Sequence, residues 1–183
     1  MISAAELTGI TYVLGAITFE EICAVDKEIS ELRDSTHETN ALHELCIESA
    51  KEHLIESVSA KEISGTKTDE NIYFITGPNA FPEIPTELSQ VIEILKLSVR
   101  KVDMNIIAMK LLQNFEKRMH DLEMGISSIG SGSAEIKKLE SHYSDLFNLY
   151  YDYDSWLPGR FTAVADQLME LSKKIEYLKQ SKK

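Results

Sequence analysis

The residues best suited to recognition gather in one short stretch, Asn148–Arg160, which reads NLYYDYDSWLPGR. The stretch holds three of the chain's seven tyrosines, its only tryptophan and two aspartates. Tyrosine and tryptophan carry much of the energy of many protein interfaces, and carboxylates complement a basic partner. A partner-binding site here would use Tyr150, Asp152, Tyr153, Asp154 and Trp156. The alternative is that the stretch ends a core helix and packs its aromatic side chains inside.

A second candidate surface is acidic. Glutamates recur at every fourth position, at Glu44, Glu48, Glu52 and Glu56. On a helix this spacing aligns them along one face, where like charges repel each other mildly. We interpret Glu44, Glu48 and Glu52 as a docking stripe for a basic protein surface, and a solvated helix face is the alternative.

The sequence lacks the spacing of the common metal and catalytic motifs. Asp152 and Asp154 form a DxD pattern, but the glycine and glutamate of a calcium loop do not follow. None of the five histidines stands three residues after a glutamate, as helical di-iron sites require, and HExxH and GxSxG are absent. We therefore predict a non-enzymatic protein with no catalytic residue, no metal and no cofactor.

The composition is that of a folded, acidic protein. The chain has 183 residues, of which 43% are hydrophobic, so a real core is expected despite a net charge of −11. Thirty acidic against nineteen basic residues argue against direct nucleic-acid binding, which needs a basic face. Only 8 glycines and 4 prolines argue against an all-β sandwich. Cys23 and Cys46 lie outside any CxxC motif, so we expect reduced, buried thiols.

The first part of the chain, 1–65, is predicted to be a helical hairpin. Ser3 and Glu6 have the spacing of a capping box at a helix start. Apolar residues at helical spacing favour a helix from Glu20 to Arg33. Glycine and β-branched residues weaken the pattern before it, and a short strand within Ile10–Phe19 is the alternative there.

A linker is predicted to follow this hairpin. The second helix of the hairpin is expected to run through Leu42–Ile63, with Gly65 as its C-cap. Residues 66–85 are then expected to form the linker, because three prolines interrupt it. Within the linker, Ile72–Thr76 reads IYFIT and is predicted to be a short strand.

The last part, 86–183, is predicted to be a long antiparallel coiled-coil hairpin. Thr86 is expected to cap a helix that continues without interruption to Met124. The turn is placed at residues 125–133, with Ser133 capping the return helix, and Pro158 interrupts that helix. After this break a heptad seam with alternating spacings of 3 and 4 follows, formed by Phe161, Val164, Leu168, Leu171, Ile175 and Leu178.

The predicted fold is therefore all-α, with two helical hairpins joined by a strand-like, proline-containing linker. The predicted function is protein–protein interaction, as an adaptor, a chaperone-like protein or an assembly component, for example of a bacterial secretion or host-interaction system. Two alternatives stay open. One is a small-ligand-binding or enzymatic helical bundle, with its site where residues 72–85 fold over the helices. The other is a structural protein that forms homo-oligomers through the heptad seam.

The sequence also bears on location. No apolar run approaches the 18 or so residues of a membrane span. The N-terminal segment has no basic residue before Lys27, unlike a secretory signal peptide. We expect a soluble protein of the cytoplasm, or one exported without a cleaved signal.

Overall fold

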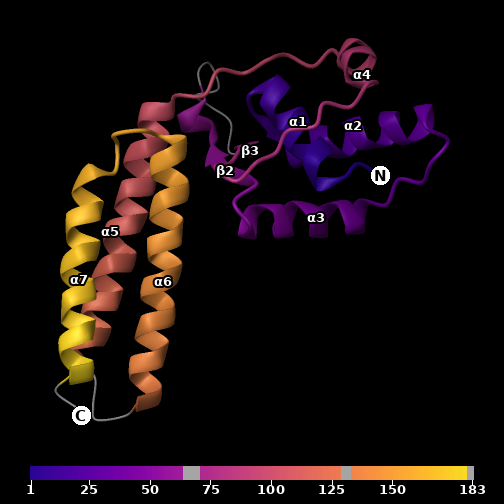
Figure 1. Ribbon diagram of the computed structural model, residues 1–183. Helices are drawn as coiled ribbons and strands as arrows, with labels where there is room; N and C mark the ends of the chain where they lie inside the picture. The colour runs from indigo at the N-terminus through magenta and orange to yellow at the C-terminus, as the bar shows by residue number, and fades with distance from the viewer. Residues whose placement is uncertain (64–70, 129–132, 181–183) are drawn as a thin grey trace. The chain divides into compact units, whose positions relative to one another are not determined.

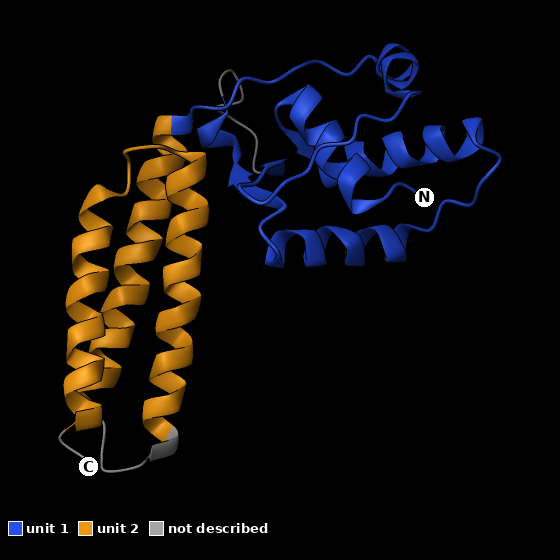
Figure 2. Ribbon diagram, in the orientation of Figure 1, with its two compact units in different colours: residues 1–104 blue, residues 105–183 orange. Residues whose placement is uncertain are grey.

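The computed structural model describes residues 1–63, 71–128 and 133–180 (Figure 1). The chain forms two compact units, residues 1–104 and residues 105–183, shown in blue and orange in Figure 2. Each unit has its own hydrophobic core, and the two clusters of buried residues share no member. The structure thus divides the chain at Met104, whereas the sequence analysis placed its boundaries at residues 65 and 85.

The first unit combines helices with a small sheet, so the prediction of an all-α fold is wrong. Strand β3 (Ile72–Thr76) is the centre of an antiparallel sheet with the order β1-β3-β2. Strand β1 is Ile17–Thr18 and strand β2 is Ile55–Ser59. The helices of this unit are α1 (Ala4–Leu14), α2 (Phe19–Leu32), α3 (Thr39–Lys51) and α4 (Leu88–Leu95), with a 3-10 turn η1 at Ala60–Glu62.

Strand β2 occupies residues that the sequence analysis assigned to a helix. Helix α3 ends at Lys51, and His53 then adopts a positive φ of 56° that turns the chain away from the helix. Strand β2 then pairs along its whole length with β3, from Ile55 opposite Thr76 to Ser59 opposite Ile72. The predicted strand at Ile72–Thr76 is confirmed, and it supplies the hydrogen-bonding partner that overrides the helical pattern of β2.

Two capping boxes start the first two helices. The predicted box is confirmed: the Ser3 side chain accepts from the Glu6 amide, and the Glu6 carboxylate accepts from the Ser3 amide. Thr18 and Glu21 form a second one at the start of α2. Each box satisfies amide groups that a helix start otherwise leaves without a partner.

The chain after β3 wraps back over α1 within the first unit. The Glu83 amide donates to the Ala5 carbonyl at 3.0 Å, and the Arg100 amide donates to the Leu14 carbonyl at 2.8 Å. Where the segment containing Glu83 passes over α1, the helix needs a glycine at Gly9, because a Cβ there would lie 2.1 Å from the Glu83 carbonyl oxygen. The described part of the predicted linker, residues 71–85, is thus packed into this unit.

The predicted continuous helix from Thr86 to Met124 is also wrong. Helix α4 stops at Leu95, where Lys96 takes the left-handed conformation, and α5 (Met104–Ser128) begins only later. Between them, the Arg100 guanidinium donates to both carboxylate oxygens of Glu21, at 2.8 and 2.6 Å. These tertiary bonds hold the intervening residues out of a helix. Helix α4 is preceded by Glu87 at its N-cap position, in place of the predicted Thr86.

The described residues of the second unit form three helices, α5, α6 (Ser133–Trp156) and α7 (Thr162–Gln180). The predicted break at Pro158 is confirmed, while the predicted turn at 125–133 begins too early, because α5 continues through Ser128. The rest of that turn and Gly65 lie outside the described residues or side chains. None of the helices in the described ranges is long and apolar enough to cross a membrane.

The heptad seam is used inside the second unit. Phe161, Val164, Leu168, Leu171 and Ile175 are buried, and Leu178 is half-buried. Four of these side chains share a cluster with α5 and α6 residues such as Phe115 and Leu146. Self-association through the seam stays a prediction, and it would require α7 to exchange between chains.

Candidate functional site

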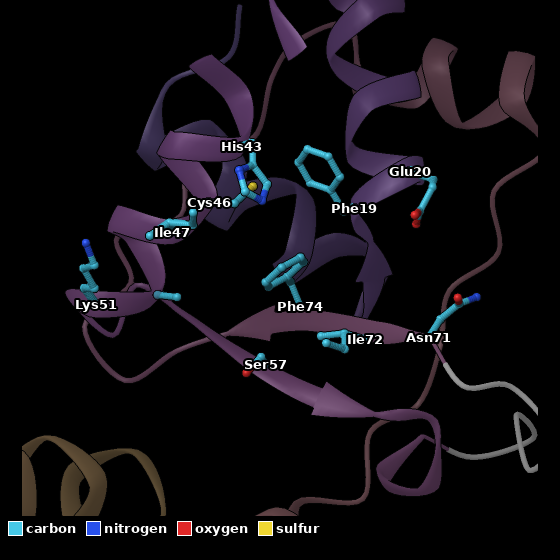
Figure 3. A pocket seen from close by; sticks show the side chains of 11 residues that line it. Phe19, Glu20, His43, Cys46, Ile47, Lys51, Ser57, Asn71, Ile72 and Phe74 are labelled. Carbon is cyan, nitrogen blue, oxygen red and sulfur yellow. The ribbon is translucent and has the colours of Figure 1, made fainter. Parts of the chain in front are cut away.

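A cavity of about 660 Å³ lies in the first unit between α2, α3 and one face of the sheet (Figure 3). Besides five polar or charged residues, it is lined by apolar side chains from three separate segments of the chain. They are Phe19 of α2, Cys46, Ile47 and Ala50 of α3, and Ile72 and Phe74 of β3. A volume of this size falls within the range of ligand pockets.

The register of the sheet explains why one face is left partly open. Ser57 lies opposite Phe74, so both side chains point to the same face, together with Ile55 and Ile72. At one end Ile55 is fully buried and belongs to the core cluster that includes Cys46 of α3. At the other end Ile72 is 63% exposed. Helix α3 therefore covers only part of this face, and the uncovered part forms the pocket.

The pocket exposes apolar side chains next to one another. Ile47 is 42% exposed on α3 and faces the same hollow as Ile72. The Phe19 and His43 rings meet edge to face, with centroids 5.3 Å apart. Covering apolar surface is worth roughly 25 cal/mol per Å², so a partner that fills this hollow gains free energy from several adjacent side chains.

Charged side chains stand at the rim. Figure 3 shows Glu20 and Lys51 on opposite sides of the apolar floor. Neither forms an ion pair with another described residue, although salt bridges elsewhere in the first unit engage Glu6, Glu21 and Arg33. Glu20 lies in the first turn of α2 and Lys51 in the last turn of α3, where each complements the dipole of its own helix.

The two cysteines are poor nucleophiles. Burial, and to a smaller extent the nearby Cys23 thiol, raise the pKa of Cys46 to about 12. Burial and the charges of Asp26 and Glu20 also raise the pKa of Cys23. Both thiols are therefore protonated at neutral pH and lack the thiolate that attack or metal binding requires. Within residues 1–63, 71–128 and 133–180, no group of three His, Cys, Asp or Glu side chains could hold a metal ion.

A buried aspartate forms a separate polar network on the same unit. One Asp26 oxygen accepts from the Ile2 amide at 2.5 Å, and the other lies 2.6 Å from Nδ1 of His37. The Nε2 atom of His37 is 3.1 Å from the Thr39 hydroxyl. The carboxylate thereby ties the N-terminal residues to the start of α3, which gives this Asp–His–Thr chain a clear structural role.

The aromatic stretch predicted as a partner site divides between core and surface. Tyr153 is only 4% exposed, and its ring stacks on Phe161 at 5.9 Å and meets Phe115 at 6.2 Å. Tyr150 and Trp156 are half-buried against the same core. For Tyr153 the core alternative is the one the structure shows. Partner binding by the half-buried Tyr150, Asp152, Asp154 and Trp156 stays a prediction.

An aromatic row that the sequence analysis missed runs along α6. Tyr143, Phe147 and Tyr151 follow each other at every fourth position, with ring centroids 5.8 and 4.9 Å apart. Tyr151 is 57% exposed. The helical i, i+4 spacing was the signal that could have identified this row.

The predicted acidic stripe is shorter than expected. Glu44 and Glu48 are exposed on α3, and Glu52 is exposed just after its end. Glu56 lies instead in β2, where its carboxylate is 2.7 Å from Nδ1 of His53. None of these glutamates lines the pocket, so the stripe and the hollow are separate surfaces.

Comparison with known proteins places the chain in a family. The model of a family described as "Family of unknown function (DUF7109)" matches residues 5–173, so the chain belongs to this family. The match extends from α1 to α7 and thus includes residues of both units. No curated protein and no solved structure matches the chain.

Proposed function

We propose that this member of the family is a non-enzymatic protein-binding module, an adaptor or assembly component, which holds apolar side chains of a partner in the pocket of its first unit. The observation that carries the proposal is the open apolar hollow of about 660 Å³ beside the sheet. Large exposed apolar patches with a polar rim are typical of interaction sites.

The chemistry of the pocket supports binding over catalysis. Its thiol is protonated, because burial raises the pKa of Cys46 to about 12. The imidazole ring of His43 packs on Phe19 and has no hydrogen-bonded carboxylate or hydroxyl among the described residues. A general base normally needs such a partner to orient it. The residues therefore provide apolar contact area and charge at the rim.

The pocket differs from the aromatic and acidic surfaces that the sequence predicts, but it lies near the site of the predicted alternative function. That alternative placed a ligand where residues 72–85 fold over helices, and Ile72 and Phe74 do line the pocket. A small apolar ligand is the second candidate function, because the volume also suits one.

The test is site-specific photocrosslinking in a native extract. A photoreactive phenylalanine analogue replaces Ile47 or Ile72 in the pocket, and Met169 of α7, which is 58% exposed, serves as the control position. We expect one protein to crosslink at both pocket positions and not at Met169. The double variant Ile47→Gln, Ile72→Thr should lose this partner in a copurification, while Met109→Gln, Met169→Gln keeps it.

The substitutions are chosen to spare the fold. Glutamine is a good helix former on α3, and threonine is β-branched and suits β3. Circular dichroism should confirm unchanged secondary structure in both double variants. Crosslinks at Met169 alone, or a copurified partner that survives loss of the two isoleucines, would contradict binding in the pocket. A small molecule released from the pocket on denaturation would favour the second candidate.

A further inference from the structure

The ends of the pocket carry opposite charges, and this limits what can bind there. Glu20 contributes a carboxylate on one side of the apolar floor, and Lys51 contributes an ammonium group on the other side (Figure 3). Neither charge is neutralised by an ion pair with another described residue. A ligand that crosses the floor therefore meets a negative group at one end and a positive group at the other.

From this arrangement we infer that the pocket binds a bipolar peptide segment of a partner protein, with apolar side chains over the floor, a basic side chain near Glu20 and an acidic side chain near Lys51. This inference rests on the proposed function and adds the chemistry of the bound segment.

The charge pattern disfavours other occupants of the same hollow. An anionic amphiphile such as a fatty acid would use Lys51 but would leave Glu20 without a partner at the other end. A strongly basic segment would find Glu20 attractive and Lys51 repulsive. Only a segment with one charge of each sign is complementary at both ends, and complementarity of this kind selects partners more than it raises affinity.

The affinity contribution of each rim charge is expected to be small but measurable. Exposed ion pairs are worth roughly 0.2–1 kcal/mol, which corresponds to up to about five-fold in affinity for each pair. Most of the affinity is expected from the apolar floor. The rim charges should decide which of several apolar segments binds best.

The test uses labelled synthetic peptides and the full chain. Each peptide has a Leu-Phe-Ile centre, glycine–serine spacers of one to four residues on both sides, and uncharged blocked termini. The end residues are Lys and Glu, two Lys, two Glu, or two Ser. Affinities are measured by fluorescence anisotropy at low salt, because salt screens exposed charges. The different spacer lengths cover a range of distances between the two peptide charges, so the distance between Glu20 and Lys51 need not be known in advance. A peptide can bind in either direction.

The expected result is a change of preference with each charge reversal. The wild-type protein should bind the Lys/Glu peptide best. Glu20→Lys should bind the Glu/Glu peptide best, and Lys51→Glu should bind the Lys/Lys peptide best. Glu93→Lys, on an exposed position of α4 away from the pocket, should keep the wild-type order.

The outcomes that overturn the inference differ from those that overturn the proposed function. An order of preference that is the same in all variants, with binding still lost in Ile47→Gln, Ile72→Thr, would remove the bipolar ligand and keep the apolar site. Binding that is unaffected by the two isoleucine changes would remove both. Dodecanoate that binds through Lys51 when no peptide binds would replace the peptide by an anionic amphiphile.

Discussion

Neighbouring tyrosines on α6 have opposite environments. Tyr153 is surrounded by aromatic rings of α5 and of the chain after Pro158, while Tyr151 points to the surface. The two residues are chemically identical and only two positions apart. The stretch NLYYDYDSW therefore contains both a core anchor and an exposed aromatic residue, and composition could not show which tyrosine was which.

The first prediction compares these two tyrosines. Tyr153→Ala should lower the free energy of unfolding of the second unit by about 3–5 kcal/mol, because it leaves a cavity between rings. Tyr151→Ala should change it by less than about 1 kcal/mol. Urea unfolding followed by Trp156 fluorescence measures this, since Trp156 is the only tryptophan and lies beside Tyr153. Equal losses for the two variants would contradict the assignment.

An ion-pair cluster centred on Arg33 connects three helices, α1, α2 and α4. Arg33 donates to both oxygens of Glu87, at 2.9 and 2.7 Å, and lies 2.8 Å from an oxygen of Glu6. The hydrogen bonds from Arg33 lower the pKa of Glu87 to about 2. Because the folded-state pKa lies below the unfolded value, this carboxylate contributes stability that is complete above about pH 4.5 and is lost as the pH falls toward 2.

The second prediction follows from the lowered pKa of Glu87 in the folded protein. Between about pH 4.5 and 2, the melting temperature of the wild-type protein should fall more steeply than that of Glu87→Gln. The difference in melting temperature between the two proteins at neutral pH, called the gap here, should therefore close in acid. Glu93→Gln, a carboxylate on the same helix with no ion pair to a described residue, should follow the wild-type profile. Melting curves recorded from pH 2.5 to 7 measure the gap. A gap that is constant with pH would refute the role of the ion pair.

At the scale of elements, two glycines illustrate how packing overrides propensity. Gly9 lies in α1 and Gly125 lies in α5, so helix propensity alone favours alanine at both. A Cβ on Gly9 would collide with the Glu83 backbone at 2.1 Å. A Cβ on Gly125 would meet only the tip of the Leu139 side chain at 3.1 Å, which can shift.

The third prediction is that the same substitution destabilises the protein at Gly9 and is tolerated at Gly125. Gly9→Ala should destabilise the first unit by about 1–3 kcal/mol or more, because the crossing segment must move. Gly125→Ala should leave the second unit within about 1 kcal/mol of wild type, or more stable. Hydrogen exchange of peptides from α1 and α5, read by mass spectrometry, reports each site separately. Unchanged protection of α1 in Gly9→Ala would show that the crossing is looser than described.

At the scale of the molecule, the chain holds two separate hydrophobic cores. One cluster contains residues of α1 to α4, and the other contains residues of α5 to α7. Each unit has the size of a small domain, for which cooperative folding on its own is common. We therefore expect two separate free energies of unfolding, one for each unit.

The fourth prediction is that residues 105–183 fold alone. The fragment should show the circular dichroism of helices and a cooperative thermal transition by Trp156 fluorescence, within a few degrees of the corresponding transition in the full chain. Tyr153→Ala should shift both by a similar amount. A fragment that is unfolded in buffer would mean that the second unit depends on the first.

The sequence by itself determined the features that depend on nearby residues. The Ser3–Glu6 capping box, the strand at Ile72–Thr76, the break at Pro158 and the burial of most of the heptad seam all follow from local hydrogen bonds, fixed backbone angles or periodicity. Each of these signals lies within a few turns of one helix or within one strand.

Only the tertiary structure decided the features that depend on distant partners. Strand β2 exists because β3 offers a ladder of hydrogen bonds, and the gap between α4 and α5 exists because Arg100 bonds to Glu21 and to Leu14. The pocket brings Phe19, Ile47 and Ile72 together from three elements. Such contacts join residues tens of positions apart, and no local pattern in one sequence encodes which distant segment will supply the partner.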